Sequence, residues 1–224
     1  MGRLFDELDN ESKQLMKRHL ELVVKANETT NLTRIANLEE GLLLHIEDSL
    51  CGLEEVKSAP DGALADIGSG AGYPGIPLAI ATKRPTLLVD SRQKKMKIVQ
   101  DIVKELGLSD QIQTYAGRAE LLARNRAGEF SVVTARALSK TAVLLELASP
   151  LLCPNGQLVC YKANVDQEEM ADAERVASIV GMKMVSDRSF DLEGHSRRII
   201  VFSKSGRPKV KLPRLEGQAQ KNPL

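Results

Sequence analysis

A short apolar run followed by closely spaced glycines, at residues 63–77, has the residue types of a ligand-binding turn. Residues 63–67 follow the turn formers at 60–62 and are apolar except for one aspartate, which predicts a buried strand. Glycines at 68, 70 and 72 allow the backbone to turn sharply and to approach a ligand with no Cβ in the way. Pro77 suits the first turn of a helix. We therefore expect the first strand–turn–helix unit of a nucleotide-binding sheet, with its ligand at the carboxyl end of the strand.

Two readings of this turn predict different ligands. The segment from Gly70 to Gly75 satisfies the dinucleotide fingerprint G-x-G-x-x-G. The other reading starts at Asp66, an acid two residues before Gly68. A carboxylate at the strand tip would repel the two phosphates of a dinucleotide and attract the ammonium group of S-adenosylmethionine (SAM). The charge therefore favours SAM, with an NAD-binding oxidoreductase as the alternative.

A second acid has the spacing expected of a ribose ligand. Residues 86–90 form an apolar run that ends in Asp90, about 20 residues past the glycine turn. In either reading a carboxylate there accepts hydrogen bonds from ribose hydroxyls. The spacing supports adenosine binding without choosing between SAM and NAD.

The rest of the chain supplies the elements that must position these residues. Strand-like and helix-like segments alternate after residue 63, and two final strands are joined at 193–195. The expected strands are 63–67, 86–90, 112–116, 130–135, 156–162, 182–192 and 197–203. The expected helices are 6–26, 38–56, 77–82, 92–106, a short one after 117–120, 142–152 and 167–180. This pattern predicts an α/β fold: a doubly wound, mostly parallel, seven-stranded Rossmann-like sheet with N-terminal helices and a terminal β-hairpin.

Charge divides the chain unevenly. Residues 1–57 carry seven Lys or Arg against twelve Asp or Glu, whereas residues 204–224 carry six basic residues against one acid. We expect an N-terminal helical appendage (1–57), a SAM-binding domain (58–204) and a basic C-terminal tail (205–224) that is unstructured from Gly206. A basic tail suits either an RNA-contacting arm or a solvated terminus.

Composition excludes several classes of protein. No apolar run approaches the roughly 18 residues that span a bilayer, and the N-terminus lacks an apolar signal segment, so we expect a cytoplasmic protein. No Cys-x-x-Cys or matching histidine pair suggests a metal site. The chain is also expected to act as a monomer.

Several motifs together resemble one family, the bacterial small-subunit rRNA guanine-N7 methyltransferases (RsmG or GidB). The motifs are Asn31-Leu32-Thr33, His45-Ile46-Glu47-Asp48-Ser49-Leu50, the stretch from Asp66 to Leu78 with its Pro-Gly-Ile-Pro extension, Ala135-Arg136-Ala137, Tyr161-Lys162 and the C-terminal ending. The resemblance covers nearly the whole chain. Two positions depart from it: Leu44 stands where an arginine is usual, and Tyr73 where Leu or Phe is common.

The resemblance implies methyl transfer from SAM to N7 of one guanosine in 16S rRNA, as free RNA or within the small ribosomal subunit. It places the methionine part of SAM near Gly68, the ribose near Asp90 and the adenine near Ala119-Glu120. The full set of expected cofactor residues is Asp66, Gly68, Gly70, Gly72, Tyr73, Asp90, Ser91, Ala119, Glu120 and Arg136. The expected RNA contacts are His45, Arg92, Arg136 and Lys162.

No general base is expected, because N7 of guanine carries a free lone pair and no proton. Alternatives at this point are a SAM-dependent enzyme for another RNA or a small molecule, an NAD-binding oxidoreductase, and a non-catalytic RNA-binding module.

Overall fold

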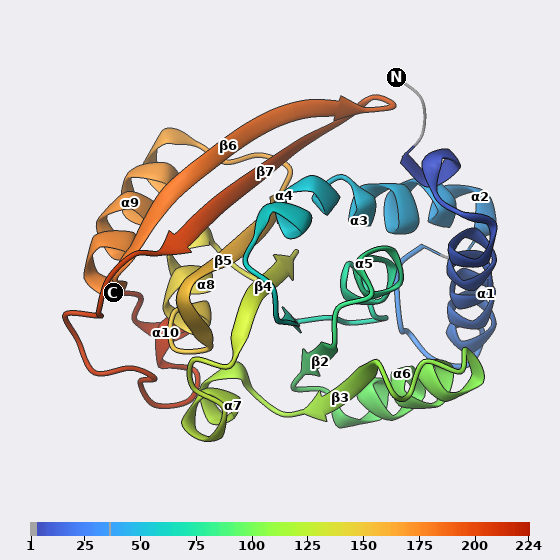
Figure 1. The fold of residues 1–224 in the computed structure, drawn as a ribbon, viewed down its shortest axis with the longest axis horizontal. Helices are drawn as coiled ribbons and strands as arrows, with labels where there is room; N and C mark the ends of the chain where they lie inside the picture. The colour runs from blue at the N-terminus through green and yellow to red at the C-terminus, as the bar shows by residue number, and fades with distance from the viewer. Residues whose placement is uncertain (1–3, 36) are drawn as a thin grey trace.

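One seven-stranded sheet organises the molecule (Figure 1). The computed structural model describes residues 4–35 and 37–224. The strand order is β3-β2-β1-β4-β5-β7-β6, with β7 antiparallel to both of its neighbours. The strands are β1 (Ala63–Ile67), β2 (Thr86–Asp90), β3 (Ile112–Ala116), β4 (Phe130–Arg136), β5 (Leu152–Lys162), β6 (Met182–Leu192) and β7 (His195–Lys204). The predicted mostly parallel, doubly wound sheet with a terminal hairpin is confirmed.

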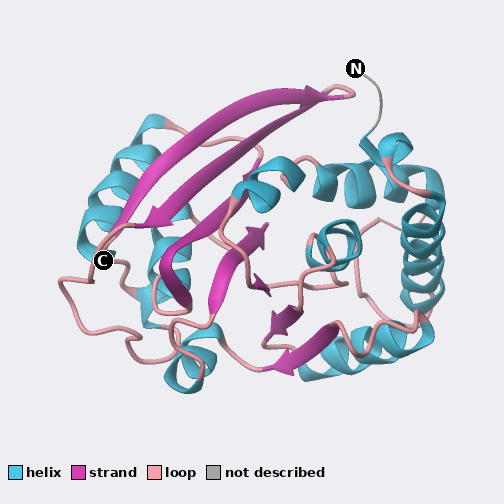
Figure 2. Ribbon diagram, in the orientation of Figure 1, coloured by secondary structure: helices cyan, strands magenta, loops and turns pink. Residues whose placement is uncertain are grey.

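Helices cover both faces of this sheet (Figure 2). The helices are η1 (Leu4–Glu7), α1 (Asn10–Asn27), α2 (Leu38–Gly41), η2 (Leu42–Glu47), α3 (Asp48–Leu50), α4 (Leu53–Ser58), α5 (Gly75–Thr82), α6 (Gln93–Glu105), α7 (Ala119–Asn125), α8 (Thr141–Ala148), α9 (Gln167–Val180) and α10 (Gln218–Lys221). Alternate strand side chains enter two separate cores: Leu64 packs with the helices up to α6, and Ala65 packs with α7 to α10.

The N-terminal helices share the first core with the sheet. Met16 and Val23 of α1 are fully buried in the same cluster as Leu64 and Leu88. The long hairpin β6–β7 reaches back over this region (Figure 1), where Arg188 forms an ion pair with Glu55 of α4 at 2.8 Å. These contacts fix the N-terminal helices against the sheet and against its terminal hairpin. No helix in the described part of the chain is long and apolar enough to span a membrane.

Two predictions about regular structure need correction. The helix expected at 38–56 is interrupted, because residues Leu42–Glu47 form a π-helix (η2) between α2 and α3. The chain beyond Gly206 is not unstructured: it packs against α8 and α9 and ends in α10, with Ala219 only 1% exposed. Both differences affect side chains at the candidate site.

Candidate active site

The glycine turn between β1 and α5 has the backbone that its sequence predicts. Gly68, Gly70 and Gly72 all have positive φ, at 76°, 57° and 93°, a region that L-residues with a Cβ rarely adopt. The amide of Gly68 donates to the carbonyl of Val89 at 2.7 Å, which ties the turn to the end of β2. At this point the strand order reverses between β1 and β4, and open α/β sheets bind their ligands in such crevices.

Asp66 holds this turn from inside the protein. Its side chain is 0% exposed; one oxygen accepts from the amide of Gly75 at 3.0 Å and the other from the hydroxyl of Thr134 at 2.9 Å. Burial raises the pKa of Asp66 to about 6, against the lowering effect of these hydrogen bonds. The expectation that Asp66 touches the cofactor stays a prediction; the structure places it behind the turn.

The raised pKa gives a testable pH dependence. Between pH ~4 and ~6 the folded chain binds more protons at Asp66 than the unfolded chain, so this group makes stability fall as pH rises through that window. Asp66→Asn retains a hydrogen-bonding group for Gly75 and Thr134 but does not titrate. We measure the unfolding free energy of both proteins in urea. As pH rises from 4 to 7, we expect the value for Asp66→Asn minus the value for wild type to increase by about 3 kcal/mol. Contributions from histidines cancel in this difference, and parallel pH profiles would contradict the prediction.

The first of two cavities, the glycine-loop pocket, opens at the tips of β1, β2 and β3 and has a volume of about 350 Å³. Its lining residues are Ile67, Gly68, Val89, Asp90, Ser91, Arg92, Gly117, Arg118, Ala119, Glu120, Leu138, Leu147 and Gln220. The pocket therefore brings together five of the predicted cofactor residues: Gly68, Asp90, Ser91, Ala119 and Glu120. Gly70, Gly72, Tyr73 and Arg136 are not among its lining residues.

Asp90 is fixed at the rim of this pocket. It accepts from the amide of Gly70 at 3.2 Å and from the guanidinium of Arg92 at 3.0–3.1 Å. Burial alone would raise the pKa of Asp90, but the hydrogen bonds from Arg92 and Gly70 outweigh it and lower the pKa, which keeps the carboxylate charged. Arg92 lines this pocket and forms an ion pair with Asp90, and its expected contact with RNA stays a prediction.

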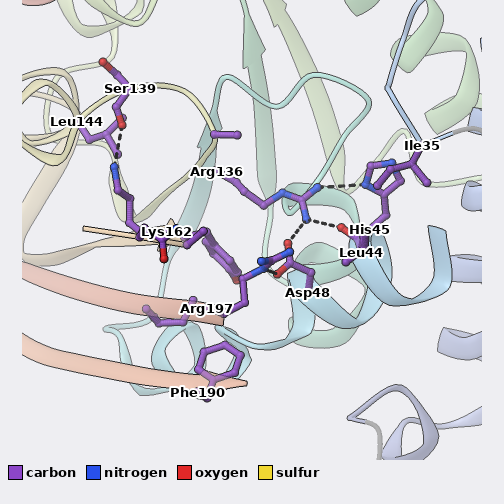
Figure 3. A pocket seen from close by; sticks show the side chains of 15 residues that line it. Ile35, Leu44, His45, Asp48, Arg136, Ser139, Leu144, Lys162, Phe190 and Arg197 are labelled. Atoms are coloured by element: carbon purple, nitrogen blue, oxygen red, sulfur yellow. Dashed lines mark hydrogen bonds and ion pairs between the residues drawn. The ribbon is translucent and has the colours of Figure 1, made fainter. Parts of the chain in front are cut away.

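The second cavity lies at the tips of β4 and β5 and has a volume of about 480 Å³ (Figure 3). We call it the three-cation pocket, after Arg136, Lys162 and Arg197. Its lining residues are Ile35, Leu44, His45, Asp48, Arg136, Ala137, Ser139, Leu144, Tyr161, Lys162, Ala163, Asn164, Phe190, Arg197 and Ile199. Three of the predicted RNA contacts, His45, Arg136 and Lys162, meet here. Their elements are far apart in sequence but converge at one edge of the sheet.

Asp48 joins two of the three cations. Its carboxylate accepts from Arg136 Nη1 at 2.7 Å and from Arg197 Nε at 2.6 Å (Figure 3). The π-helix η2 immediately precedes Asp48, and π turns often occur at functional sites. Lys162, the third cation, forms an ion pair with Glu169 at 2.6 Å and donates to the carbonyl of Ser139.

An aromatic stack lies beside the two arginines. Tyr73 is stacked on His45 with ring centroids 4.3 Å apart and an interplanar angle of 7°, and His19 lies 4.5 Å away. His45 Nδ1 accepts from Arg136 at 3.4 Å, so its Nε2 donates to the hydroxyl of Thr33 at 2.9 Å. Burial, and then the charge of Arg136, lower the pKa of His45 to about 3, which leaves the ring neutral at physiological pH.

Tyr73 itself yields a stability prediction. Its hydroxyl is buried and has no hydrogen-bond partner among the described residues, a state that costs about 1–3 kcal/mol. Tyr73→Phe removes the hydroxyl and preserves the stack on His45. We expect the unfolding free energy in urea to rise by about 1 kcal/mol. A lower unfolding free energy in Tyr73→Phe would contradict the prediction, because it would show that the hydroxyl of Tyr73 forms a stabilising hydrogen bond.

The segment after β4 separates the two pockets. Leu138 lines the glycine-loop pocket, whereas Ala137 and Ser139 line the three-cation pocket. Leu138 also covers the glycine turn, since a Cβ built on Gly68 would lie 2.8 Å from Leu138 Cδ1. A ligand bound near Gly68 would therefore be separated from a ligand bound near Arg136 only by the segment 137–139.

Sequence reasoning missed three residues of these pockets. Arg197 lies on the hairpin strand β7, and no local motif indicates that this strand folds back onto Asp48. Gln220 lies in the tail that was expected to be unstructured. Asp48 stands in the sequence only as part of the motif that begins at His45, and its spacing of three residues from His45 on one helix face is the available signal.

The glycine-loop pocket fits the chemical groups of SAM. The charged carboxylate of Asp90 suits a ribose diol and a nearby cation, and the side chains of Ile67, Val89 and Leu147 offer apolar surface to an adenine ring. The backbone at Gly68 has no Cβ that would fill the space below Leu138. The two arginines of this pocket, Arg92 and Arg118, each lie beside a carboxylate, at 3.0 Å from Asp90 and 3.6 Å from Glu120, so the pocket offers no unpaired cluster of positive charge to two phosphates.

Comparisons with solved structures support this fold assignment. The cofactor-bound protein Rv0187 from MTB superimposes with a TM-score of 0.60, at 17% identity, over 84% of this chain and 90% of that one. Magnesium protoporphyrin IX methyltransferase from Synechocystis, solved with bound SAM, gives a TM-score of 0.58 at 16% identity, over 84% of this chain and 97% of that one. At these identities the likeness concerns the fold alone.

Sequence comparisons are more specific. The family model described as "GidB: rRNA small subunit methyltransferase G" matches residues 12–200. The protein called ribosomal RNA small subunit methyltransferase G in Streptococcus gordonii is 35% identical over 97% of this chain and 94% of its own length. The protein of the same name in Desulfitobacterium hafniense is 36% identical over 99% of this chain and 93% of its own length. With the two pockets and the fold, these matches show that the chain belongs to the GidB family of small-subunit rRNA methyltransferases.

Proposed function

We propose that this protein transfers the methyl group of SAM to N7 of a guanosine in 16S rRNA. The observation that carries the proposal is the pair of pockets on opposite sides of residues 137–139, one suited to adenosine and the other lined by three cations. Membership of the GidB family supports the reaction and the RNA. The substrate is the rRNA itself or the small ribosomal subunit that contains it.

The reaction needs alignment more than proton transfer. Bound SAM supplies a methyl group on a positively charged sulfur. Held at Gly68 and Asp90, SAM would supply this methyl group to the free lone pair of guanine N7, with the bonding electrons of the C–S bond left on sulfur and the positive charge passed to the guanine. No proton leaves N7, so no general base is required. Burial lowers the pKa values of His19 and His45 to about 4 and about 3, which makes both rings weak proton acceptors at physiological pH. Holding the reactants in line contributes about 7–11 kcal/mol in favourable cases.

The three-cation pocket has the size and charge for one extruded nucleotide. Its volume of about 480 Å³ lies within the range of small-ligand pockets. N7 is hidden in the deep groove of an RNA helix, so the target guanosine must lie in a loop or be turned outward. Arginine and lysine donors recognise the O6 acceptor of guanine or a phosphate, and Arg136, Arg197 and Lys162 supply such donors. N7 itself must accept no hydrogen bond, so that its lone pair can attack the methyl group. Asp48 offsets part of their charge, so the positive product guanine is not strongly repelled.

In this proposal the working protein is a cytoplasmic monomer that needs no metal ion. Across residues 4–35 and 37–224, no three His, Cys, Asp or Glu side chains are gathered as they would be around a metal ion. We expect the active protein to sediment with the mass of one chain, and we expect full activity in the presence of a chelator.

The test is methyl transfer from radiolabelled SAM to small-subunit RNA or particles from a strain that lacks the enzyme, followed by digestion to nucleosides. We expect the label in 7-methylguanosine, and its loss in Asp90→Ala. Label in another nucleoside would contradict the N7 assignment. Binding of SAM with no label in any 16S rRNA preparation would contradict the substrate and direct attention to other RNAs or small molecules.

A further inference from the structure

The C-terminal tail lies against the adenosine side of the glycine-loop pocket. Residues 205–224 run back from the end of β7, and α10 lies beside α7 and α8 in Figure 1. Ala219 of α10 is 1% exposed and belongs to the core that α7, α8 and α9 share. The tail is therefore part of the folded domain.

Two buried carboxylates fix this tail. Glu146 of α8, only 3% exposed, accepts from Arg214 through both oxygens, at 2.6 and 2.5 Å. Glu120 at the start of α7, 4% exposed, accepts from the amide of Gly217 at 2.7 Å. A buried carboxylate is costly unless it is paired or hydrogen-bonded, so each contact holds the tail firmly to the body of the protein.

The contact between Glu120 and the tail gives Glu120 a role other than the expected contact with adenine. The family resemblance places Glu120 against the adenine, but Oε1 of its carboxylate is already committed to Gly217. Beside it, Arg118 lies 3.6 Å from the same oxygen and donates through Nη2 to the Gln220 carboxamide at 3.3 Å. Gln220 thus reaches the pocket from the tail, next to Gly117 and Ala119.

We propose that the C-terminal tail is part of the cofactor site: Glu120 and Glu146 dock it, and Gln220 contacts the adenine of SAM. This inference rests on the proposed function, since it requires that the glycine-loop pocket binds adenosine.

The chemistry of a carboxamide suits adenine. Adenine offers an amino donor and ring-nitrogen acceptors, and glutamine carries both a donor and an acceptor with matching spacing. Because Arg118 occupies Oε1 of Gln220, the amide Nε2 remains to donate to N1 of adenine. Hypoxanthine carries a proton on N1, where adenine has an acceptor, so a donor from Gln220 favours adenine over hypoxanthine.

The test measures binding of S-adenosylhomocysteine and of its hypoxanthine analogue, S-inosylhomocysteine, by calorimetry on the full-length chain. Gln220→Ala is expected to bind S-adenosylhomocysteine about tenfold more weakly, the equivalent of one lost hydrogen bond, and to bind the analogue with nearly unchanged affinity. The matched control is Lys221→Ala, an exposed neighbour on α10 that is not a lining residue of the pocket, and we expect wild-type affinity for both ligands.

A second variant tests the docking of the tail. Arg214→Ala removes the partner of Glu146, and neither of these two residues lines the pocket; the variant is expected to weaken S-adenosylhomocysteine binding to a similar degree. Circular dichroism before each titration confirms that the variants are folded. Gln220→Ala with wild-type affinity for both ligands would overturn the inference alone. A wild-type protein that binds neither ligand would overturn the proposed function as well.

Discussion

Gly68→Ala is expected to weaken binding of S-adenosylhomocysteine about a hundredfold and to abolish methyl transfer. The new Cβ would lie 2.8 Å from Cδ1 and 3.2 Å from Cβ of Leu138, so the side chain of Leu138, which lines the glycine-loop pocket, must shift. At φ of 76° an alanine also carries about 1–2 kcal/mol of backbone strain. Both effects act where the turn must lie close to the ligand. Calorimetric titration and the radiolabel assay measure the two losses.

A matched glycine separates strain from occlusion. Gly107 also has positive φ, at 70°, but a Cβ built there meets no atom within 4 Å, and it ends α6 away from the pocket. Gly107→Ala should therefore lose a similar amount of stability in urea and retain wild-type affinity. If both variants bound S-adenosylhomocysteine with equal affinity, the prediction that the glycine turn is part of the cofactor site would be contradicted.

Asp48→Ala is expected to lower the unfolding free energy by about 3–5 kcal/mol and to stop methyl transfer, with little effect on S-adenosylhomocysteine affinity. The carboxylate links Arg136 and Arg197, and its loss leaves two guanidinium groups together without their shared counter-charge. Removing one partner from a largely buried ion pair has this cost in general. The side chains of Asp48 and Arg136 are 7% and 16% exposed, so solvent screens the pair only weakly.

Asp48→Asn is the matched control because it preserves size and one acceptor but removes the charge. We expect the unfolding free energy of Asp48→Asn to lie between the values of wild type and Asp48→Ala. Its affinity for S-adenosylhomocysteine should be unchanged, since Asp48 lines the three-cation pocket and not the glycine-loop pocket. An Asp48→Ala protein with wild-type stability and turnover would show that the two arginines need no counter-charge.

The parallel sheet was predictable because its strands are encoded locally. Each central strand is a short apolar run with turn formers beside it, and the bounds predicted for β1, β2 and β3 agree with the structure. The acid at the end of β2 was found in the same way, since its distance from the glycine turn is set by the length of one strand–helix unit.

Features that depend on distant contacts were not predictable. The tail has a basic, low-hydrophobicity sequence, and its order depends on contacts with other elements, among them Glu146, Glu120 and the core around Ala219. The π turn before Asp48 has no distinct residue pattern, and the position of Arg197 depends on how the hairpin folds over α3 and α4. Arg136 is intermediate: a charge at the end of an apolar strand signalled a partner, but did not identify it as Asp48.

The central claim is that the glycine-loop pocket binds the cofactor and the three-cation pocket binds the guanosine. Its most direct test is a pair of titrations, with S-adenosylhomocysteine and with unmethylated small-subunit rRNA, on Asp90→Ala and on Arg197→Ala. Asp90→Ala should lose affinity for S-adenosylhomocysteine and retain affinity for RNA, whereas Arg197→Ala should show the reverse. If each variant weakened both ligands equally, or if the losses were exchanged, this division between the pockets would be contradicted.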